Sequence, residues 1–112
     1  MKKLLIVTGG AGFVGSNLIK ILLKKKKFNL ISLDNYSTGI KKNHIKNGRV
    51  KYLNGHTKDI EKKLNRNSKI INSIFHFGEF SRIYQSFIKL DDCIESNLIG
   101  THAVFKFCMK HK

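Results

Sequence analysis

The sequence predicts an α/β fold in which a doubly wound parallel sheet is covered by helices on both faces. Short apolar runs alternate along the chain with segments of helical periodicity, which is the order expected of βαβ units. The first run, Leu4 to Val7, is apolar without alternation, as expected for a strand buried on both sides. The 112 residues, 41% of them hydrophobic, include no proline, so we expect one globular domain over residues 1–112.

The first half of the chain predicts two strands and the helix between them. Residues 3–8 are expected to form the central strand and residues 30–34 the second strand. Residues 12–25 are expected to form a helix, because apolar side chains recur there at helical spacing: Val14, Leu18, Ile21 and Leu22. The lysines from Lys24 to Lys27 mark its end, where cations interact favourably with the helix dipole.

The second half of the chain begins with a polar loop over residues 35–48, which is expected to hold one helical turn. An edge strand, a short helix, a fourth strand and the longest helix follow, over residues 50–53, 58–67, 71–78 and 92–109. The edge strand is indicated by the alternation of Val50 and Tyr52 with Lys51. One face of the longest helix is formed by Ile94, Leu98, Thr101, Phe105 and Cys108.

The glycines after the first strand have the spacing of a phosphate-binding turn. The stretch TGGAGFVG contains Gly10-x-Gly12-x-x-Gly15 and also Gly9-x-x-Gly12-x-x-Gly15. Amide groups at the start of the following helix lack partners, and together with the helix dipole they attract a diphosphate. The glycines permit a tight turn, a close approach of the backbone to the ligand, and close packing of helix on strand. The turn is therefore predicted to bind a dinucleotide.

Asp34 ends the second predicted strand, about 20 residues after the glycines, where a dinucleotide-binding fold places its ribose-binding acid. A carboxylate there accepts hydrogen bonds from the ribose hydroxyls and repels a 2′-phosphate, which favours NAD over NADP. The alternative is an ordinary loop acid that pairs with Lys41 or Lys42.

Four motifs follow one another along the chain: TGGAGFVGSNL, LDNYSTG, IFHFG and NLIGTHAVFKFC. In this order they resemble the motifs of the extended short-chain dehydrogenase/reductase family, in particular its nucleotide-sugar epimerases and dehydratases. These stretches are similar to the family's phosphate loop, ribose-binding turn, fourth strand and Asn-x-x-Gly-Thr helix. The resemblance extends over nearly the whole chain. It implies the N-terminal half of a Rossmann-type fold, of about four strands with flanking helices, with the C-terminal part absent.

The resemblance also implies NAD as the cofactor and a set of residues around it. In addition to Gly9, Gly10, Gly12, Gly15 and Asp34, these are Phe13 and Val14 at the pyrophosphate, Asn35, Tyr36, Ser37, Thr38 and Gly39 at the adenosine ribose, Phe77, Gly78, Glu79, Phe80 and Ser81 at the nicotinamide half, and Asn97 at the nicotinamide ribose.

Two positions depart from the family's pattern. After the third strand the family has Gly-Asp, whose carboxylate meets the adenine amino group, whereas this chain has Gly55-His56-Thr57. His56 and Thr57 are kept as candidates, because a neutral histidine can accept that hydrogen bond through one ring nitrogen. The second departure is Glu79, which puts a carboxylate near the nicotinamide.

No catalytic residue is assigned, because the chain lacks the Tyr-x-x-x-Lys pair that the resemblance implies for the chemistry. The residues four positions after Tyr36, Tyr52 and Tyr84 are Ile40, His56 and Ile88. Histidine titrates near neutrality, but His76 lies on a buried strand, and we interpret it as a hydrogen-bonded core residue. No cluster has metal-ligand spacing, so no metal is expected.

The sequence thus predicts the NAD-binding part of a nucleotide-sugar epimerase or dehydratase, an isomerase or lyase that acts by transient hydride transfer. A truncation or a split gene would leave this chain inactive alone, and a nucleotide sugar would bind only with the missing C-terminal part. The full-length parent is expected to form a homodimer through helices that include the one beginning near Asp92. The alternatives are a stand-alone dinucleotide-binding module without catalysis and a basic nucleic-acid-binding protein.

The net charge of +15 would suit nucleic-acid binding if the lysines clustered, but they are scattered over every segment, so no nucleic acid is expected. No segment approaches the roughly 20 apolar residues of a membrane span, so no membrane is expected either. The first apolar run is too short for an export signal. Cys93 and Cys108 show no disulfide or metal pattern and are expected to be buried thiols of a cytoplasmic protein.

Overall fold

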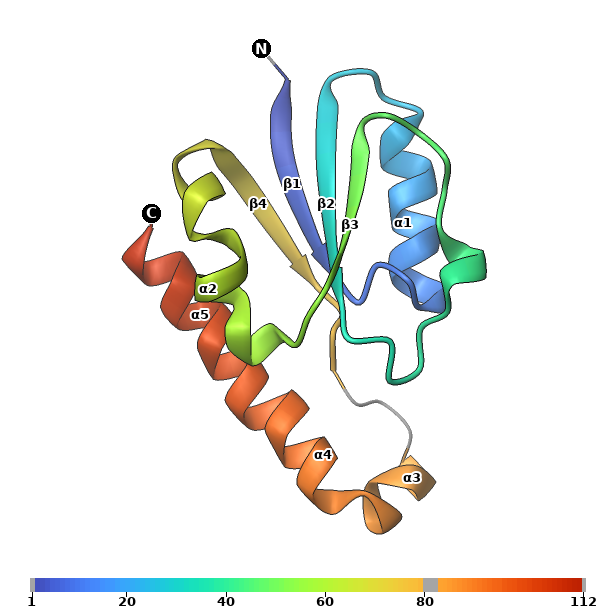
Figure 1. Cartoon of the computed structure of the whole chain (residues 1–112), viewed down its shortest axis with the longest axis vertical. Coiled ribbons are helices and arrows are strands. Elements are labelled where there is room, and N and C mark those ends of the chain that lie inside the picture. The colour runs from blue at the N-terminus through green and yellow to red at the C-terminus, as the bar shows by residue number, and fades with distance from the viewer. Residues whose placement is uncertain (1, 80–82, 112) are drawn as a thin grey trace.

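A four-stranded parallel sheet forms the centre of the computed structural model, which describes residues 2–79 and 83–111 (Figure 1). Its strands are β1 (Lys3–Thr8), β2 (Phe28–Asp34), β3 (Val50–Asn54) and β4 (Ile71–His76). The strand order is β3-β2-β1-β4, and all three neighbouring pairs are parallel. The prediction that the first strand is central is confirmed, since β1 lies between β2 and β4.

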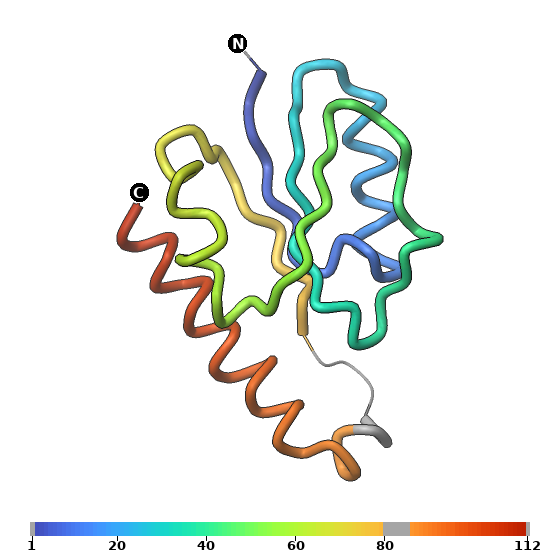
Figure 2. The backbone as a smooth tube through the Cα atoms, in the orientation of Figure 1, coloured from blue at the N-terminus to red at the C-terminus, as the bar shows by residue number. Residues whose placement is uncertain are grey.

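Helices cover both faces of this sheet. The α-helices are α1 (Phe13–Leu23), α2 (Ile60–Leu64), α3 (Ile83–Ile88), α4 (Leu90–Ile94) and α5 (Thr101–Lys110). Short 3₁₀ turns cover Lys41–Asn43, Thr57–Asp59 and Asn65–Ile70, and a π-helical turn covers Glu95–Gly100. Figures 1 and 2 show α1 on one side of the sheet and α2 and α5 on the other. The molecule therefore has the three layers of a doubly wound α/β fold.

Alternate residues of β1 point into two separate cores. Leu4 and Ile6 belong to the core under α2 and α5, whereas Leu5 and Val7 belong to the core under α1. Ile19 of α1 is fully buried in the second core. The unbroken apolar run at the start of the sequence thus has the cause predicted for it, because a strand covered on both faces needs apolar side chains at every position.

The predicted elements differ from the observed ones mainly at their ends. The second strand begins at Phe28, because Phe28 and Asn29 extend the pairing with β1. The fourth strand ends at His76, before Gly78, and the short helix is reduced to α2 between two 3₁₀ turns. The helical turn predicted in the polar loop is found at Lys41–Asn43. The helix α3 was not predicted.

The buried side of α1 also differs from the predicted stripe. Val14 and Ile21 are exposed, and the fully buried positions of this helix are Gly15, Ile19 and Leu23. Leu18 and Leu22 pack at the margin of the core, as expected. The stripe is therefore rotated around the helix relative to the prediction.

Residues 90–110 form one long helix from α4, the π-helical turn and α5, with apolar side chains on two sides. The inner side packs on the sheet through Gly100, Val104 and Phe107. On the other side lies what we call the outer apolar face: Ile94, Leu98, Phe105 and Met109, which are all exposed. Three residues of the predicted stripe, Ile94, Leu98 and Phe105, lie on this outer face, whereas Thr101 contacts His76 at the end of β4. Most of the predicted stripe is therefore not the side that packs on the sheet.

The two cysteines are free, but neither is buried, so the prediction of buried thiols is wrong. Cys93 is half-buried, whereas Cys108 is exposed and lines a hollow between α5 and β4. In the part of the chain that the structure describes, no helix is long and apolar enough to cross a membrane.

Candidate functional site

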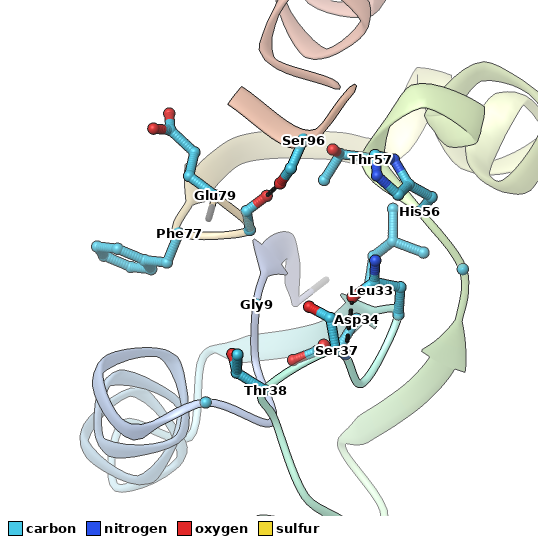
Figure 3. Close-up of a pocket in the computed structure, with 14 residues that line it drawn as sticks. Gly9, Leu33, Asp34, Ser37, Thr38, His56, Thr57, Phe77, Glu79 and Ser96 are labelled. Atoms are coloured by element: carbon cyan, nitrogen blue, oxygen red, sulfur yellow. Dashed lines mark hydrogen bonds between the residues drawn. The ribbon is translucent and has the colours of Figure 1, made fainter. Parts of the chain in front are cut away.

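A groove runs along the carboxyl ends of the four strands, which we call the strand-end groove (Figure 3). It lies where ligands bind in open α/β sheets. The predicted site residues that line it are Gly9, Gly12, Asp34, Asn35, Ser37, Thr38, His56, Thr57, Phe77, Gly78 and Glu79. Leu33, Gly55 and Ser96 line it as well, and the sequence analysis did not single them out.

The glycine loop, residues 9–15, forms one wall of the groove and leads directly into α1. Gly9 has φ +73°, in the left-handed region that favours glycine. Gly12 is the N-cap residue, and no side chain caps the first turn of α1. Uncapped amide groups at a helix start are available to an anion. A side chain on Gly15 would collide with the loop, because a Cβ there would lie 2.2 Å from the Gly9 carbonyl oxygen.

Three further predicted residues of this loop, like Gly15, lie outside the lining of the groove. Gly10 packs against β2, since a Cβ on it would lie 2.1 Å from Ser32 Oγ. Phe13 and Val14 begin α1 and are exposed, Phe13 to 82%. The prediction that Phe13 and Val14 lie against a diphosphate therefore depends on their backbone amides and not on packed side chains.

Asp34 connects the end of β2 to the glycine loop. Its carboxylate is buried and accepts two hydrogen bonds, from the Ala11 amide at 3.0 Å and from the Tyr36 amide at 2.8 Å. A carboxylate offers about four acceptor positions, so capacity remains for two hydroxyl groups. The ion pairs found among residues 2–79 and 83–111 do not include Asp34, so the alternative pairing with Lys41 or Lys42 is absent there.

The loop after Asp34 is held by a cluster of aromatic rings. Tyr36 has a left-handed backbone, with φ +61°, and its hydroxyl lies 2.6 Å from His44 Nε2. The His44 ring stacks on Tyr52 at a centroid distance of 3.8 Å. Burial and the nearby Asp34 carboxylate raise the pKa of Tyr36. The side chain of Tyr36 thus anchors the loop, and Asn35, Ser37 and Thr38 are left to line the groove.

Gly39 is buried behind the Asp34 carboxylate and does not line the groove. A Cβ on Gly39 would lie 2.7 Å from Asp34 Oδ2, so the close approach of this loop requires glycine. The role of Gly39 is therefore to let the loop close against Asp34.

His76 lies within a directed series of hydrogen bonds at the end of β4. The Gly78 amide donates to Thr8 Oγ1 at 2.9 Å, so the Thr8 hydroxyl is free to donate to His76 Nδ1, 2.6 Å away. His76 Nε2 lies 3.0 Å from Thr101 Oγ1, which donates to Glu79 Oε1 at 3.2 Å. Both ring nitrogens are thus engaged, as the interpretation of His76 as a hydrogen-bonded core residue requires.

Burial lowers the pKa of His76, and the Glu79 carboxylate, 3.5 Å from Nε2, opposes this by favouring the charged form. Glu79 lines the groove but directs its carboxylate to Thr101 and His76. Glu79 therefore lies in the groove, where the nicotinamide half is expected, and its carboxylate also contacts Thr101 of α5.

The far wall of the groove is formed by the turn after β3 and by the long helix. Thr57 is buried against the long helix, where a Cβ on Gly100 would lie 2.2 Å from its hydroxyl oxygen. Ser96 donates to the Gly78 carbonyl at 3.2 Å. Ser96 lines the groove in place of the predicted Asn97, whose amide group lies 3.7 Å from Cys93 Sγ. Phe80 and Ser81 lie outside the described residues.

Comparisons with known proteins agree with this geometry. The sequence profile of the NAD-dependent epimerase/dehydratase family matches residues 5–112. A dTDP-D-glucose 4,6-dehydratase from Dictyostelium discoideum is 31% identical over 114 residues, which cover 96% of this chain and 26% of that protein.

Two solved structures are similar over nearly the whole chain. An epimerase from Methanothermobacter thermautotrophicus has a TM-score of 0.88 and 27% identity, covering 98% of this chain and 32% of its own. A dTDP-glucose 4,6-dehydratase from Streptomyces venezuelae, solved with NAD bound, has a TM-score of 0.87 and 26% identity. The match covers 96% of this chain and 36% of that protein.

This chain spans between about a quarter and a third of the length of these relatives. The predicted Rossmann-type fold and the predicted resemblance are both confirmed by these matches. NAD is the cofactor that the family's description names. The chain belongs to the NAD-dependent epimerase/dehydratase family.

Proposed function

We propose that this chain is the NAD-binding part of an enzyme that epimerises or dehydrates a nucleotide sugar. The proposal rests on two features that lie in the same groove. One is the glycine loop, which leads into a first turn of α1 that no side chain caps, and the other is the buried Asp34 carboxylate at the end of β2. The Ala11 amide joins them by its hydrogen bond of 3.0 Å to Asp34. A ligand that fits must carry a diphosphate next to a sugar with free hydroxyl groups.

The residues present suit the adenosine half of NAD. The amides at the start of α1 would bind the diphosphate. Asp34 would accept hydrogen bonds from the two ribose hydroxyls, and its negative charge would oppose the 2′-phosphate of NADP. Asn35, Ser37 and Thr38 would surround the ribose, since they line the groove beside Asp34.

When bound, NAD supplies a reversible acceptor for a hydride from the sugar. The residues of this chain would bind and orient the cofactor. The sequence contains no Tyr-x-x-x-Lys pair, so we expect no turnover of a nucleotide sugar by this chain alone. The names of the relatives, a dTDP-D-glucose dehydratase among them, support a nucleoside diphosphate sugar as the substrate class.

The proposal is tested by titrating the purified protein with NAD and NADP, using calorimetry or ligand-observed NMR for weak binding. We expect NAD to bind at least about tenfold more tightly than NADP, because a carboxylate opposes the phosphate. A micromolar or tighter affinity for NAD would favour a stand-alone dinucleotide-binding module. Weaker binding of NAD would favour the NAD-binding part of a larger enzyme. Equal affinities, or no binding of NAD, would contradict the proposed function.

The variant Asp34→Asn keeps an acceptor for one backbone amide, whereas alanine would leave the Ala11 and Tyr36 amides without partners. We expect Asp34→Asn to weaken NAD binding and to narrow the difference between NAD and NADP. Asp92→Asn removes an exposed carboxylate outside the groove and serves as the matched control.

A further inference from the structure

His56 occupies the part of the strand-end groove beyond Asp34. It follows β3, which pairs with β2, and the neighbouring Gly55 amide donates to the Asp34 backbone carbonyl at 3.0 Å. Figure 3 shows the His56 ring beside Thr57, across from the glycine loop. If the diphosphate lies at the glycine loop and the ribose at Asp34, as the proposed function requires, the base lies next to His56.

The hydrogen bonds around His56 fix which ring nitrogen carries a proton. The Lys58 amide donates to His56 Nδ1 at 3.0 Å, so Nδ1 is an acceptor and the neutral ring carries its proton on Nε2. A protonated ring also carries a proton on Nε2. This nitrogen is therefore a donor in both charge states. Within residues 2–79 and 83–111, no hydrogen bond joins Nε2 to another group of the chain.

The ring is held from the side of the long helix as well. A Cβ on Gly100 would lie 3.5 Å from His56 Cε1, so the helix backbone is close to the ring. Lys58 forms an ion pair with Glu95, which fastens the same turn to the helix. The hydrogen bond from the Lys58 amide occupies the accepting nitrogen of the neutral ring, so a donor role for His56 fits this geometry better than the expected acceptance from the adenine amino group.

We propose that His56 recognises the base of the dinucleotide as a hydrogen-bond donor, so that the groove accepts hypoxanthine as well as adenine. Adenine offers ring nitrogens as acceptors and an amino group as a donor. Hypoxanthine has a carbonyl oxygen in place of the amino group and a proton on N1, and it keeps N3 and N7 as acceptors. A donor such as Nε2–H finds an acceptor on either base, a ring nitrogen of adenine or the carbonyl oxygen of hypoxanthine. A carboxylate at this position would favour the amino group of adenine and would be repelled by the carbonyl oxygen of hypoxanthine.

The test compares NAD with nicotinamide hypoxanthine dinucleotide in competition, observed by NMR on the purified protein. We expect the two affinities to agree within about threefold, because His56 loses no hydrogen bond with either base. A preference for NAD above about tenfold would overturn the inference. If neither dinucleotide binds, the proposed function itself is contradicted, so the two failures are distinguishable. This comparison uses the wild-type protein, so its result does not depend on whether a variant folds.

His56→Asp replaces the donor by an acceptor and is expected to raise the preference for NAD to about tenfold or more. His56→Phe removes the hydrogen bond and is expected to weaken both dinucleotides to the same extent. His102→Asp makes the same change of charge at an exposed histidine outside the groove and should leave the ratio unchanged. An unchanged ratio in His56→Asp would overturn the inference.

Discussion

Gly12 and Gly15 differ in what surrounds them, although both belong to the same motif. A Cβ on Gly15 would lie 2.2 Å from the Gly9 carbonyl oxygen and 2.9 Å from the Gly10 Cα, both rigid backbone atoms. A Cβ on Gly12 would meet only the Gly9 oxygen, at 3.3 Å, and would otherwise extend into the groove. Gly15 is thus required for packing, whereas Gly12 keeps open the space for a ligand.

Two alanine substitutions separate these requirements. We expect Gly15→Ala to destabilise the fold by about 3 kcal/mol, because the backbone must move. Gly12→Ala should change stability by less than about 1 kcal/mol, since its backbone angles suit alanine. Gly12→Ala should nevertheless weaken NAD binding about tenfold or more. Urea unfolding and NAD titration check both, and a stable, NAD-binding Gly15→Ala protein would contradict this division.

The partly buried imidazole of His76 makes stability depend on pH. Burial lowers the pKa of His76 below its usual 6.5, so between the folded-state pKa and 6.5 the unfolded chain binds more protons than the folded chain. Stability is therefore expected to decrease as the pH falls below about 6.5 and to level off once the folded-state pKa is passed.

Urea unfolding of the wild type and of His76→Gln between pH 5 and 7.5 measures this contribution. The glutamine variant does not titrate at this position, so its stability should depend less on pH than that of the wild type. His102→Gln, at an exposed histidine, should follow the wild type. If the free energy of unfolding depends on pH in the same way in the wild type and in His76→Gln, the pKa of His76 does not change on folding and the expectation is contradicted.

At the scale of elements, the long helix explains where the sequence-based prediction succeeded and where it did not. Helical periodicity over residues 92–109 predicted the helix but selected the outer apolar face, because both sides carry apolar residues. The π-helical turn Glu95–Gly100 also interrupts the α-helical spacing on which the prediction relied. The side that packs is decided by Gly100, since only a small residue fits against Thr57.

Site residues were predictable where a local motif positions them. The glycine loop and Asp34 lie at the ends of adjacent strands, so their proximity follows from the alternation of strands and helices. Ser96 and the donor role of His56 depend on contacts between segments far apart in the sequence or on a backbone amide. The side chain of Tyr36 turns away from the groove because His44, in the following turn, engages its hydroxyl.

The contact between Gly100 and Thr57 joins the long helix to the groove and can be tested by a double-mutant cycle. Gly100→Ala alone should cost about 1–3 kcal/mol, because its Cβ would lie 2.2 Å from Thr57 Oγ1. In the Thr57→Ala background the same change should cost at least about 1 kcal/mol less. Gly48→Ala, with no atom within 4 Å of the new Cβ, is the control. Strict additivity of the two changes in the free energy of unfolding would contradict the contact.

At the scale of the whole molecule, two features act against each other. The outer apolar face exposes Leu98, Phe105 and Met109 to 68%, 66% and 72%, and β4 forms an edge of the sheet among the described residues. Exposed apolar patches and open strand edges favour association. The net charge of +15 opposes association, since like charges repel.

We therefore expect this chain to self-associate in a manner that depends on salt. Charge repulsion is screened over about 10 Å at 0.1 M salt and over about 3 Å at 1 M, while burial of the outer apolar face is not weakened by salt. Sedimentation velocity should show association that rises with protein concentration and with sodium chloride concentration. The double variant Leu98→Lys with Phe105→Lys should sediment as a monomer under the same conditions.

Ile21→Lys provides the matched control, because Ile21 is an exposed apolar residue on α1, on the opposite side of the sheet from α5. It adds the same kind of charge without touching the outer apolar face, so it should still associate. If Ile21→Lys and the double variant dissociate equally, net charge alone controls association and the outer apolar face is not the contact surface. If the wild type is monomeric even at about 1 M salt, where charge repulsion is screened, the outer apolar face does not drive association and the expectation is contradicted.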